Sequence, residues 1–258
     1  MLTAIGARPA PARTAGRNSP RLADHHRVQA ALDARRAGLA PFWLRMQQPS
    51  RITEELETLV VDGEDTFTAM LGHLLTSLGH RVTVARFDEP GLRERVAAHP
   101  GALVLGPGPG DPAAADDPKM AVLHPIVTDA LAAVRAGRRT APLLAVCLSH
   151  QLLSGALGLP LVRKAVPYQG AQESVDLFGE QRTVGFYNTF TARCTDDDAA
   201  RLAAAGVEVA RDPLTGDVHA LRGPGFAGLQ FHPESVLTRD GVEIVAGLLR
   251  GAVAGVPR

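Results

Sequence analysis

Cys147 stands between a short apolar run, residues 143–146, and a helix-like segment, residues 149–157. A cysteine on such a strand-to-helix turn exposes its sulfur at the edge of a sheet, beside the first N–H groups of the helix. Both features favour a nucleophilic thiolate. A free cysteine can equally be a small buried core residue, so this stretch alone leaves both interpretations open.

A histidine and a glutamate lie two residues apart in residues 231–237, Phe-His-Pro-Glu-Ser-Val-Leu, directly after a predicted strand. A catalytic cysteine needs a nearby base, and that base needs an acceptor that orients it. If this strand end faces the Cys147 turn, then Cys147, His232 and Glu234 supply nucleophile, base and orienting carboxylate. A histidine beside a proline is a common loop feature. His232 and Glu234 therefore indicate a catalytic site only in combination with Cys147.

Alternating strands and helices are predicted from about residue 56 onward. The predicted strands are residues 58–62, 81–86, 102–105 and 143–146, and the predicted helices are residues 67–78, 91–98 and 123–134. This alternation indicates a mainly parallel sheet that is covered on both faces. The third strand leads into residues 106–112, Gly-Pro-Gly-Pro-Gly-Asp-Pro, where glycines allow the backbone to approach a ligand closely.

Short strands with turn residues between them follow residue 157, and their rhythm predicts antiparallel or mixed additions to the sheet. They are residues 161–166, 173–178, 182–187, 207–211, 218–222 and 225–231, and a helix over residues 241–252 ends the pattern. The expected fold class is therefore α/β, with a mainly parallel, mixed central sheet flanked by helices.

The bulk properties limit the possible functions. The chain has 258 residues, 45% of them hydrophobic, and a formal net charge of zero. A neutral balance argues against a nucleic acid or membrane partner, and no apolar run approaches the roughly 20 residues of a membrane helix. With only two cysteines, a disulfide framework is not expected, which favours a reducing, cytoplasmic location.

Residues 1–55 differ in composition from the remainder, residues 56–258, which we predict to be the catalytic domain. Residues 1–50 hold eight Arg and two Asp, a net charge of +6. The first 20 residues are predicted to be disordered, either as a transit peptide or, as we prefer, as a linker or fusion remnant. Residues 21–46 show a helical pattern that includes Trp43, which predicts an arm that docks on a neighbouring domain.

Three motifs together resemble class I, triad-type glutamine amidotransferases. They are Cys-Leu-Ser-His-Gln at residues 147–151, the glycine-proline loop at residues 106–112 and Phe-His-Pro-Glu-Ser at residues 231–235. The resemblance covers about residues 56–252 and implies a flavodoxin-like fold.

The glycine-proline loop and the run from His232 to Thr238 resemble the chorismate-aminating branch: anthranilate synthase, aminodeoxychorismate synthase and the phenazine-pathway aminodeoxyisochorismate synthase. Residues 62–68 and 184–190 are most similar to the fused phenazine-type or anthranilate-type synthases, and residues 27–44 resemble the linker of those enzymes.

The resemblance implies that the chain hydrolyses glutamine through Cys147, His232 and Glu234 and delivers ammonia to a synthase subunit or fused domain that uses chorismate. No metal or cofactor is expected in this domain, whereas Mg²⁺ is expected in the synthase partner. The implied oxyanion donors are the N–H groups of Gly108 and Leu148. The implied glutamine-binding residues are Gly108, Gln151, Thr189 and Phe190.

Two positions depart from the commonest family pattern. Ser149 stands where Gly is usual, and Asn188-Thr-Phe stands where His-Ser-Leu is usual. Ser is small, and the second segment is expected to bind through its backbone, so we expect both departures to be compatible with activity. Two other functions remain open: a regulatory or interaction module with a silent glutaminase, and a hydrolase of γ-glutamyl peptides.

Several other polar residues are expected to have no catalytic role. His150 is expected to be structural, and Cys194 a bystander. Asp111 is expected to shape the loop that contains it. His25 and His26 are expected to lie in a solvated arm, and His73 and His80 at the surface. Residues 196–198 are expected to form a helix N-terminus.

Overall fold

The computed structural model describes residues 26–27, 29–30, 56–114 and 116–254. Most of the predicted arm, including Trp43, lies outside these residues, so its docking and the boundary at residue 55 stay predictions. Of the two arm histidines, His26 is described, and it is exposed in a helical stretch.

A seven-stranded sheet forms the centre of the part from residue 56 to residue 254, in the order β2-β1-β3-β4-β11-β10-β9. Neighbouring strands from β2 to β11 are parallel, whereas β10 and β9 are antiparallel additions. The predicted mainly parallel, mixed sheet is therefore confirmed. The strands are β1 (Glu57–Asp62), β2 (Arg81–Arg86), β3 (Ala102–Leu105), β4 (Leu143–Val146), β9 (Glu208–Arg211), β10 (Val218–Gly223) and β11 (Phe226–Leu229).

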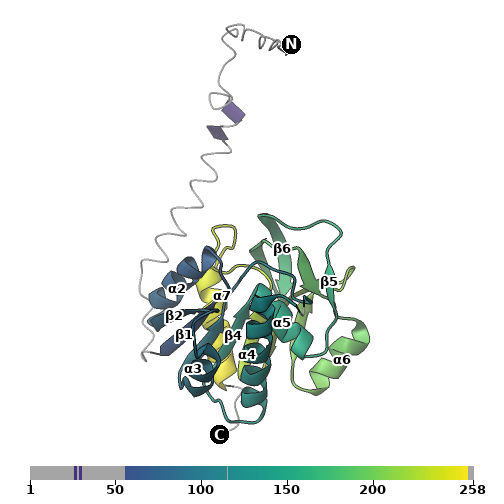
Figure 1. Cartoon of the computed structure of the whole chain (residues 1–258). Coiled ribbons are helices and arrows are strands. Elements are labelled where there is room, and N and C mark those ends of the chain that lie inside the picture. Colours follow the sequence, from purple (N-terminus) through teal and green to yellow (C-terminus); the bar gives the residue numbers. More distant parts are fainter. Residues whose placement is uncertain (1–25, 28, 31–55, 115, 255–258) are drawn as a thin grey trace, which may run out of the picture. The chain divides into compact units, whose positions relative to one another are not determined.

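Helices cover both faces of this sheet (Figure 1). One buried cluster joins the sheet to α3 (Leu92–Ala98), α4 (Pro118–Arg135), α5 (Leu148–Ala156) and α6 (Asp196–Ala204). The other cluster joins it to α2 (Phe67–Ser77) and α7 (Gly241–Ala254). Strands β3 and β4 are completely buried, which explains why they are continuous apolar runs rather than alternating ones.

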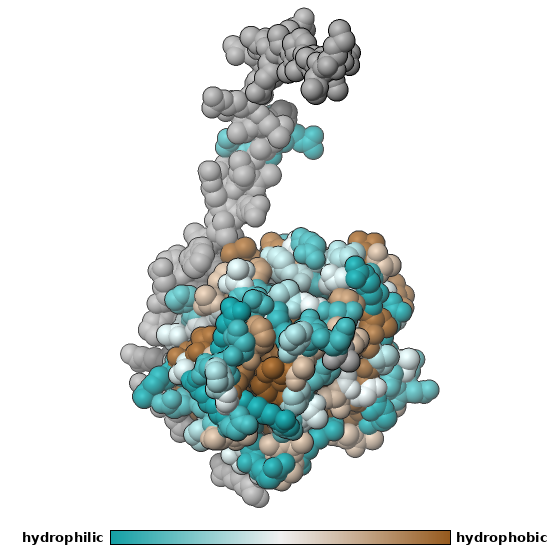
Figure 2. Space-filling model, in the orientation of Figure 1, coloured by the Kyte–Doolittle hydropathy of each residue, from teal (hydrophilic) through white to brown (hydrophobic). Residues whose placement is uncertain are grey.

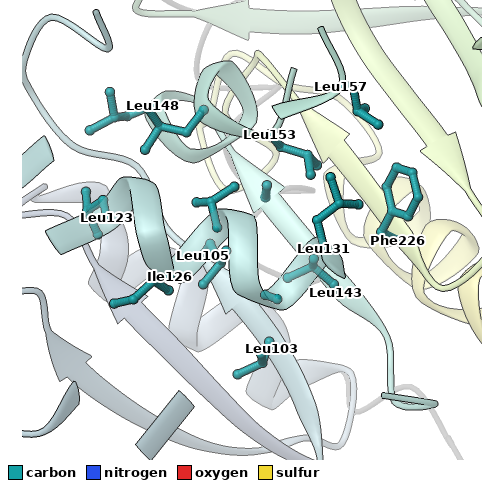
Figure 3. Packing of buried hydrophobic residues seen from close by; sticks show 14 of the residues in the cluster. Leu103, Leu105, Leu123, Ile126, Leu131, Leu143, Leu148, Leu153, Leu157 and Phe226 are labelled. Carbon is teal, nitrogen blue, oxygen red and sulfur yellow. The ribbon is translucent and has the colours of Figure 1, made fainter. Parts of the chain in front are cut away.

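The first cluster includes leucines of β3, β4, α4 and α5, which lie between the sheet and the helices (Figure 3). Leu103, Leu143 and Leu153 have no exposed surface. Truncating such a side chain to Ala costs about 2–5 kcal/mol of unfolding free energy. This packing fixes α5 against β4 and so holds the turn between them.

Helix α4 begins five residues before the periodic apolar positions from which it was predicted. Asp117 caps it, and its side chain accepts from the N–H groups of Lys119, at 2.7 Å, and Met120, at 3.4 Å. Pro118 occupies the first helical turn, where the missing N–H costs nothing. The pair Asp-Pro was the sequence signal for this start.

Two small sheets accompany the central one. Strands β6 (Ala171–Leu177) and β7 (Glu180–Phe186) form an antiparallel hairpin, and β5 (Leu161–Arg163) pairs with β8 (Phe190–Ala192). Strand β5 is shorter than predicted and ends at Arg163, which pairs with Phe190, the first residue of β8. Strand β8 was not predicted, because three residues give too short a pattern to recognise.

The surface of the described part has few strongly exposed large hydrophobic side chains, namely Val84, Val166 and Leu214. The face in Figure 2 accordingly mixes hydrophilic and hydrophobic residues. Within the described residues, none of the helices has the length and apolar character needed to cross a membrane.

The carboxyl ends of the parallel strands β1, β3, β4 and β11 lie at one edge of the sheet. The chain leaves these strands into the turn at residues 62–67, the loop at residues 106–112, the turn at Cys147 and the segment at residues 230–235. Ligand sites in open α/β sheets lie at this edge. All three predicted motifs are therefore brought together here.

Candidate active site

Cys147 occupies a sharp turn between β4 and α5. Its backbone angles, φ 52° and ψ −106°, fall outside the ordinary regions for a residue with a side chain. The Cys147 N–H donates to the carbonyl of Leu229 on β11 at 2.8 Å, which holds the turn in place. Strain of this kind is characteristic of functional sites, and the turn has the geometry of a nucleophile elbow. The side chain is 6% exposed and borders a pocket.

His232 and Glu234 form a buried pair at the end of β11. His232 Nδ1 donates to Glu234 Oε1 at 2.7 Å, and both side chains are 1% exposed or less. Burial lowers the pKa of His232. An electrostatic interaction and a hydrogen bond with Cys147, together with Glu234, outweigh burial and raise this pKa well above 6.5. With Nδ1 bonded to Glu234, Nε2 is the nitrogen left to face Cys147. The three residues singled out from the sequence thus lie together, and their catalytic roles stay a prediction.

Two aromatic rings flank the imidazole of His232. The ring centroid of Phe67 lies 4.7 Å from that of His232, and the ring of Tyr187 meets it edge-on at 5.2 Å. The Tyr187 hydroxyl is 3.1 Å from Ser235 Oγ, which fixes the tyrosine. These contacts restrict the rotation of the base. Neither aromatic residue was singled out from the sequence, because its contact with His232 depends on which segments meet at the sheet edge.

The loop at residues 106–112, hereafter the oxyanion loop, passes close to the turn after β1. A Cβ atom on Gly108 would lie 2.3 Å from the carbonyl oxygen of Gly63, so only glycine fits this approach. Gly108 borders the same pocket as Cys147. Leu148 is the first residue of α5, so its N–H has no acceptor within the helix. These two N–H groups stay our predicted oxyanion donors.

Ser149, the departure from the usual glycine, is accommodated by a specific bond. Its hydroxyl donates to the carbonyl of Gly106 at 2.7 Å, and the residue is 1% exposed. Gly106 N–H in turn donates to Val61 O at 2.8 Å. The serine therefore ties the nucleophile helix to the start of the oxyanion loop. The elbow has room for this side chain, as expected.

The predicted glutamine-binding residues line one pocket of about 340 Å³, together with Cys147 and Gly108. Gln151 Nε2 donates to the carbonyl of Phe190 at 2.7 Å. The Asn188 side chain donates to the same carbonyl at 2.8 Å. The remaining lining residues are Asp65, Phe67, Pro109, Gly110, Gln169, Tyr187, Asn188 and Thr189.

Gln230 is a site residue that sequence reasoning missed. Its side-chain nitrogen lies 3.9 Å from Cys147 Sγ, and its side-chain oxygen accepts from Gln151 at 3.1 Å. The residue is 1% exposed. The sequence signal that could have identified Gln230 is an amide side chain at an otherwise apolar strand end. Burial of an amide without a hydrogen-bond partner would be costly there.

Other predicted settings are mostly confirmed. His150 is completely buried on α5, and Cys194 is a buried free thiol whose pKa burial raises. Residues 196–198 form the first turn of α6, and Thr195 caps that helix in a capping box. His73 is exposed. The surface prediction for His80 was wrong: it is 6% exposed, and its Nδ1 lies 2.7 Å from Thr58 Oγ1 on β1.

Side chains that could ligate a metal ion are dispersed within the described ranges. No three His, Cys, Asp or Glu side chains there are grouped to hold such an ion.

The fold and site together define an α/β protein in which Cys147, on a sharp strand-to-helix turn, lies beside a buried His232–Glu234 pair. The family description "Glutamine amidotransferase class-I" matches residues 59–250, which is most of the chain. The chain belongs to this family.

Similar proteins differ in the share of their length that this chain covers. The chain is 45% identical over 241 residues to "Anthranilate synthase, phenazine specific" of Pseudomonas fluorescens. This match covers 92% of this chain but 36% of the relative. It is 31% identical over 202 residues to "Anthranilate synthase component 2" of Azospirillum brasilense, covering 74% of this chain and 94% of that protein. The chain thus spans about a third of the length of the phenazine-specific relatives.

A solved structure shares the fold. It is that of a putative GMP synthase subunit from Thermoplasma acidophilum, with a TM-score of 0.59 and 19% sequence identity. The match covers 78% of this chain and 95% of the other. It supports the architecture described above.

Proposed function

We propose that the chain hydrolyses glutamine at Cys147 and delivers the ammonia to a chorismate-using synthase, as a partner subunit or a further domain. The observation that carries the proposal is the buried His232–Glu234 pair beside Cys147, which itself lines a small polar pocket. A charged imidazole beside a cysteine sulfur is the arrangement that keeps a thiolate poised at neutral pH.

In the first step, Cys147 Sγ attacks the side-chain amide carbon of glutamine, and the carbonyl electron pair moves onto oxygen. The N–H groups of Gly108 and Leu148 stabilise the resulting oxyanion. Loss of one such donor typically lowers kcat by about 10²–10³. The bond of Ser149 to Gly106 keeps the two donor segments at a fixed spacing.

In the second step, the carbon–nitrogen bond breaks, and His232 Nε2 gives its proton to the departing nitrogen, so ammonia leaves. A γ-glutamyl thioester remains on Cys147. The neutral His232 then takes a proton from water, which attacks the thioester and releases glutamate. Glu234 bonds Nδ1 throughout, so the imidazole keeps one orientation.

Glutamine recognition is assigned to the segment at residues 187–190 together with Gln151. The Phe190 carbonyl is held by the side chains of Gln151 and Asn188, which sets the orientation of the Thr189–Phe190 backbone at the pocket wall. We infer that backbone groups here bind the α-amino and α-carboxylate groups of glutamine. This explains why Asn-Thr-Phe can replace the more usual side chains.

The relatives guide the proposal for the product. Because anthranilate synthases and aminodeoxychorismate synthases are among them, the synthase is expected to make anthranilate or aminodeoxyisochorismate. Mg²⁺ is expected in the synthase and no cofactor in this domain. A cytoplasmic location fits a glutaminase whose Cys147 must stay reduced.

The test is glutamate release from glutamine by the purified chain, alone and with a candidate synthase plus chorismate. Release in either condition, abolished by C147A, supports the proposal. The same variant should leave product formation from added ammonia intact. If the wild-type chain releases no glutamate in either condition, the result would contradict the proposal and favour a regulatory module. A preference for γ-glutamyl peptides over glutamine would favour the peptide hydrolase.

A further inference from the structure

We propose that Lys119 is a positioning residue that holds the oxyanion loop in its working orientation, through the carbonyl of Pro109 and the carboxylate of Glu64. The proposal rests on the glutaminase function proposed above and deepens it. It assigns a role to a buried cation that the triad and the glutamine pocket leave unexplained.

Lys119 lies at the start of α4, and the residue is 8% exposed. Its ammonium donates to the Pro109 carbonyl at 3.2 Å and pairs with Glu64 at 3.0 Å. The same ammonium lies 5.2 Å from the centroid of the Phe87 ring. A buried lysine with these partners is fixed in position, because its charge must stay compensated.

The bond to Pro109 sets the plane of one peptide group of the loop. The Pro109–Gly110 peptide is trans, so its N–H points away from the side on which Lys119 holds the carbonyl. Glycines at 108 and 110 flank Pro109, and glycine gives the backbone the freedom to rotate such a plane. Gly110 already has φ 141°. The loop therefore needs an outside anchor to keep one orientation, and Lys119 supplies it.

Glu64 connects this anchor to the opposite wall of the site. It has φ 75°, which is uncommon for a residue with a side chain, and it also pairs with Arg86 at 3.1 Å. Its neighbour Gly63 touches the oxyanion loop, since a Cβ there would lie 2.6 Å from Pro107 O. Phe67, three residues after Glu64, packs on His232. Lys119 thus links the loop to the turn that also contacts the base.

A loss of this anchor is expected to act on the transition state rather than on glutamine binding. The donors of an oxyanion hole act only when the carbonyl oxygen becomes charged, so their misplacement lowers kcat more than it raises KM. Misplacement by about 1 Å can cost as much as about 10²-fold in rate. The Cys147–His232 pair does not contact Lys119, so its chemistry towards a simple alkylating agent is expected to persist.

The experiment compares K119M, K119R and E64Q with wild type and with D129N, an exposed ion-pair variant further along α4. Steady-state glutamate release gives kcat and KM, and iodoacetamide measures Cys147 reactivity. K119M should lower kcat roughly tenfold to hundredfold, with KM within about threefold and an unchanged alkylation rate. K119R should recover part of the loss, E64Q should show a smaller loss, and D129N should match wild type.

Hydrogen exchange of the amides in residues 106–111 gives a second readout that needs no turnover. K119M should speed exchange in this segment while leaving the amides of β3 and β4 protected as in wild type. Wild-type kcat and wild-type exchange in K119M would overturn the proposal, and so would a rise in KM alone. If wild type releases no glutamate, the proposed function fails, and the exchange comparison still decides the role of Lys119.

Discussion

Two regions of the molecule bury a histidine completely and give it opposite charge states. His150 lies on α5, one turn from the nucleophile, and neither ring nitrogen makes a well-formed hydrogen bond. Burial lowers its pKa to about 3, although a contact with the backbone of Val218 offsets part of the effect. His232 is equally buried, yet its pKa lies well above 6.5, because Cys147 and Glu234 favour the charged form.

The difference shows that the partners of a buried histidine, and not burial alone, set the direction of its pKa shift. A neutral, unpartnered imidazole such as His150 fills space: a Cβ on Gly228 would lie 2.6 Å from its Nδ1. A charged imidazole between a sulfur and a carboxylate can hold a thiolate and later give up a proton. The predictions that follow change one of these histidines or a residue beside one of them.

The largest effect is expected from E234Q. Gln keeps the shape but carries no charge, so the imidazolium loses its buried counter-charge and His232 its fixed orientation. We expect kcat for glutamate release to fall by about 10² or more, with a smaller change in KM. Product formation from added ammonia by the synthase is the control. A loss below fivefold would show that Glu234 does not set the charge of His232.

The second prediction concerns His150 and acid stability. Its pKa is lowered on folding, so its contribution to stability is complete above pH 6.5 and is lost as the pH falls towards about 3. Between pH 7 and pH 5 this loss is about 2 kcal/mol. H150L should reduce the pH dependence of the urea-unfolding free energy by about that amount. An unchanged pH dependence would mean that His150 binds a proton in the folded state.

The third prediction uses S149A. It removes the bond from the nucleophile helix to Gly106 and leaves an acceptor inside the site without its donor. We expect kcat to fall about tenfold, because the spacing between Leu148 and Gly108 is relaxed, with little change in Cys147 alkylation. S149G, the usual family residue, serves as the comparison. Full activity of S149A would reduce the serine to a space-filling role.

The smallest effect is expected from F67L. The ring of Phe67 packs on His232 at a centroid distance of 4.7 Å, and an aromatic face stabilises a cation by about 0.5–2 kcal/mol. Its removal should lower the pKa of His232 and move the alkaline limit of glutaminase activity to lower pH. A pH profile of kcat for F67L beside wild type measures this. An alkaline limit that stays in place would assign Phe67 to packing only.

The sequence was enough to predict that Cys147, His232 and Glu234 lie together, because they stand in short contiguous motifs at strand ends. Strand and helix patterns likewise predicted the central sheet and the helices that pack on both of its faces. The roles of Gln230 and Phe67 were not predictable from local patterns, since they depend on which segments meet at the sheet edge. His80 was placed on the surface for the same reason: its partner, Thr58, lies on the neighbouring strand.

The most direct test of this account is a titration of the histidine side chains by NMR of the ¹⁵N-histidine-labelled chain, with C147A and H150L for assignment. The account predicts that His232 stays charged at pH 7, with a pKa above 6.5 that falls in C147A, while His150 stays neutral down to about pH 3. A His232 that is neutral at pH 7, or unaffected by C147A, would contradict the central claim.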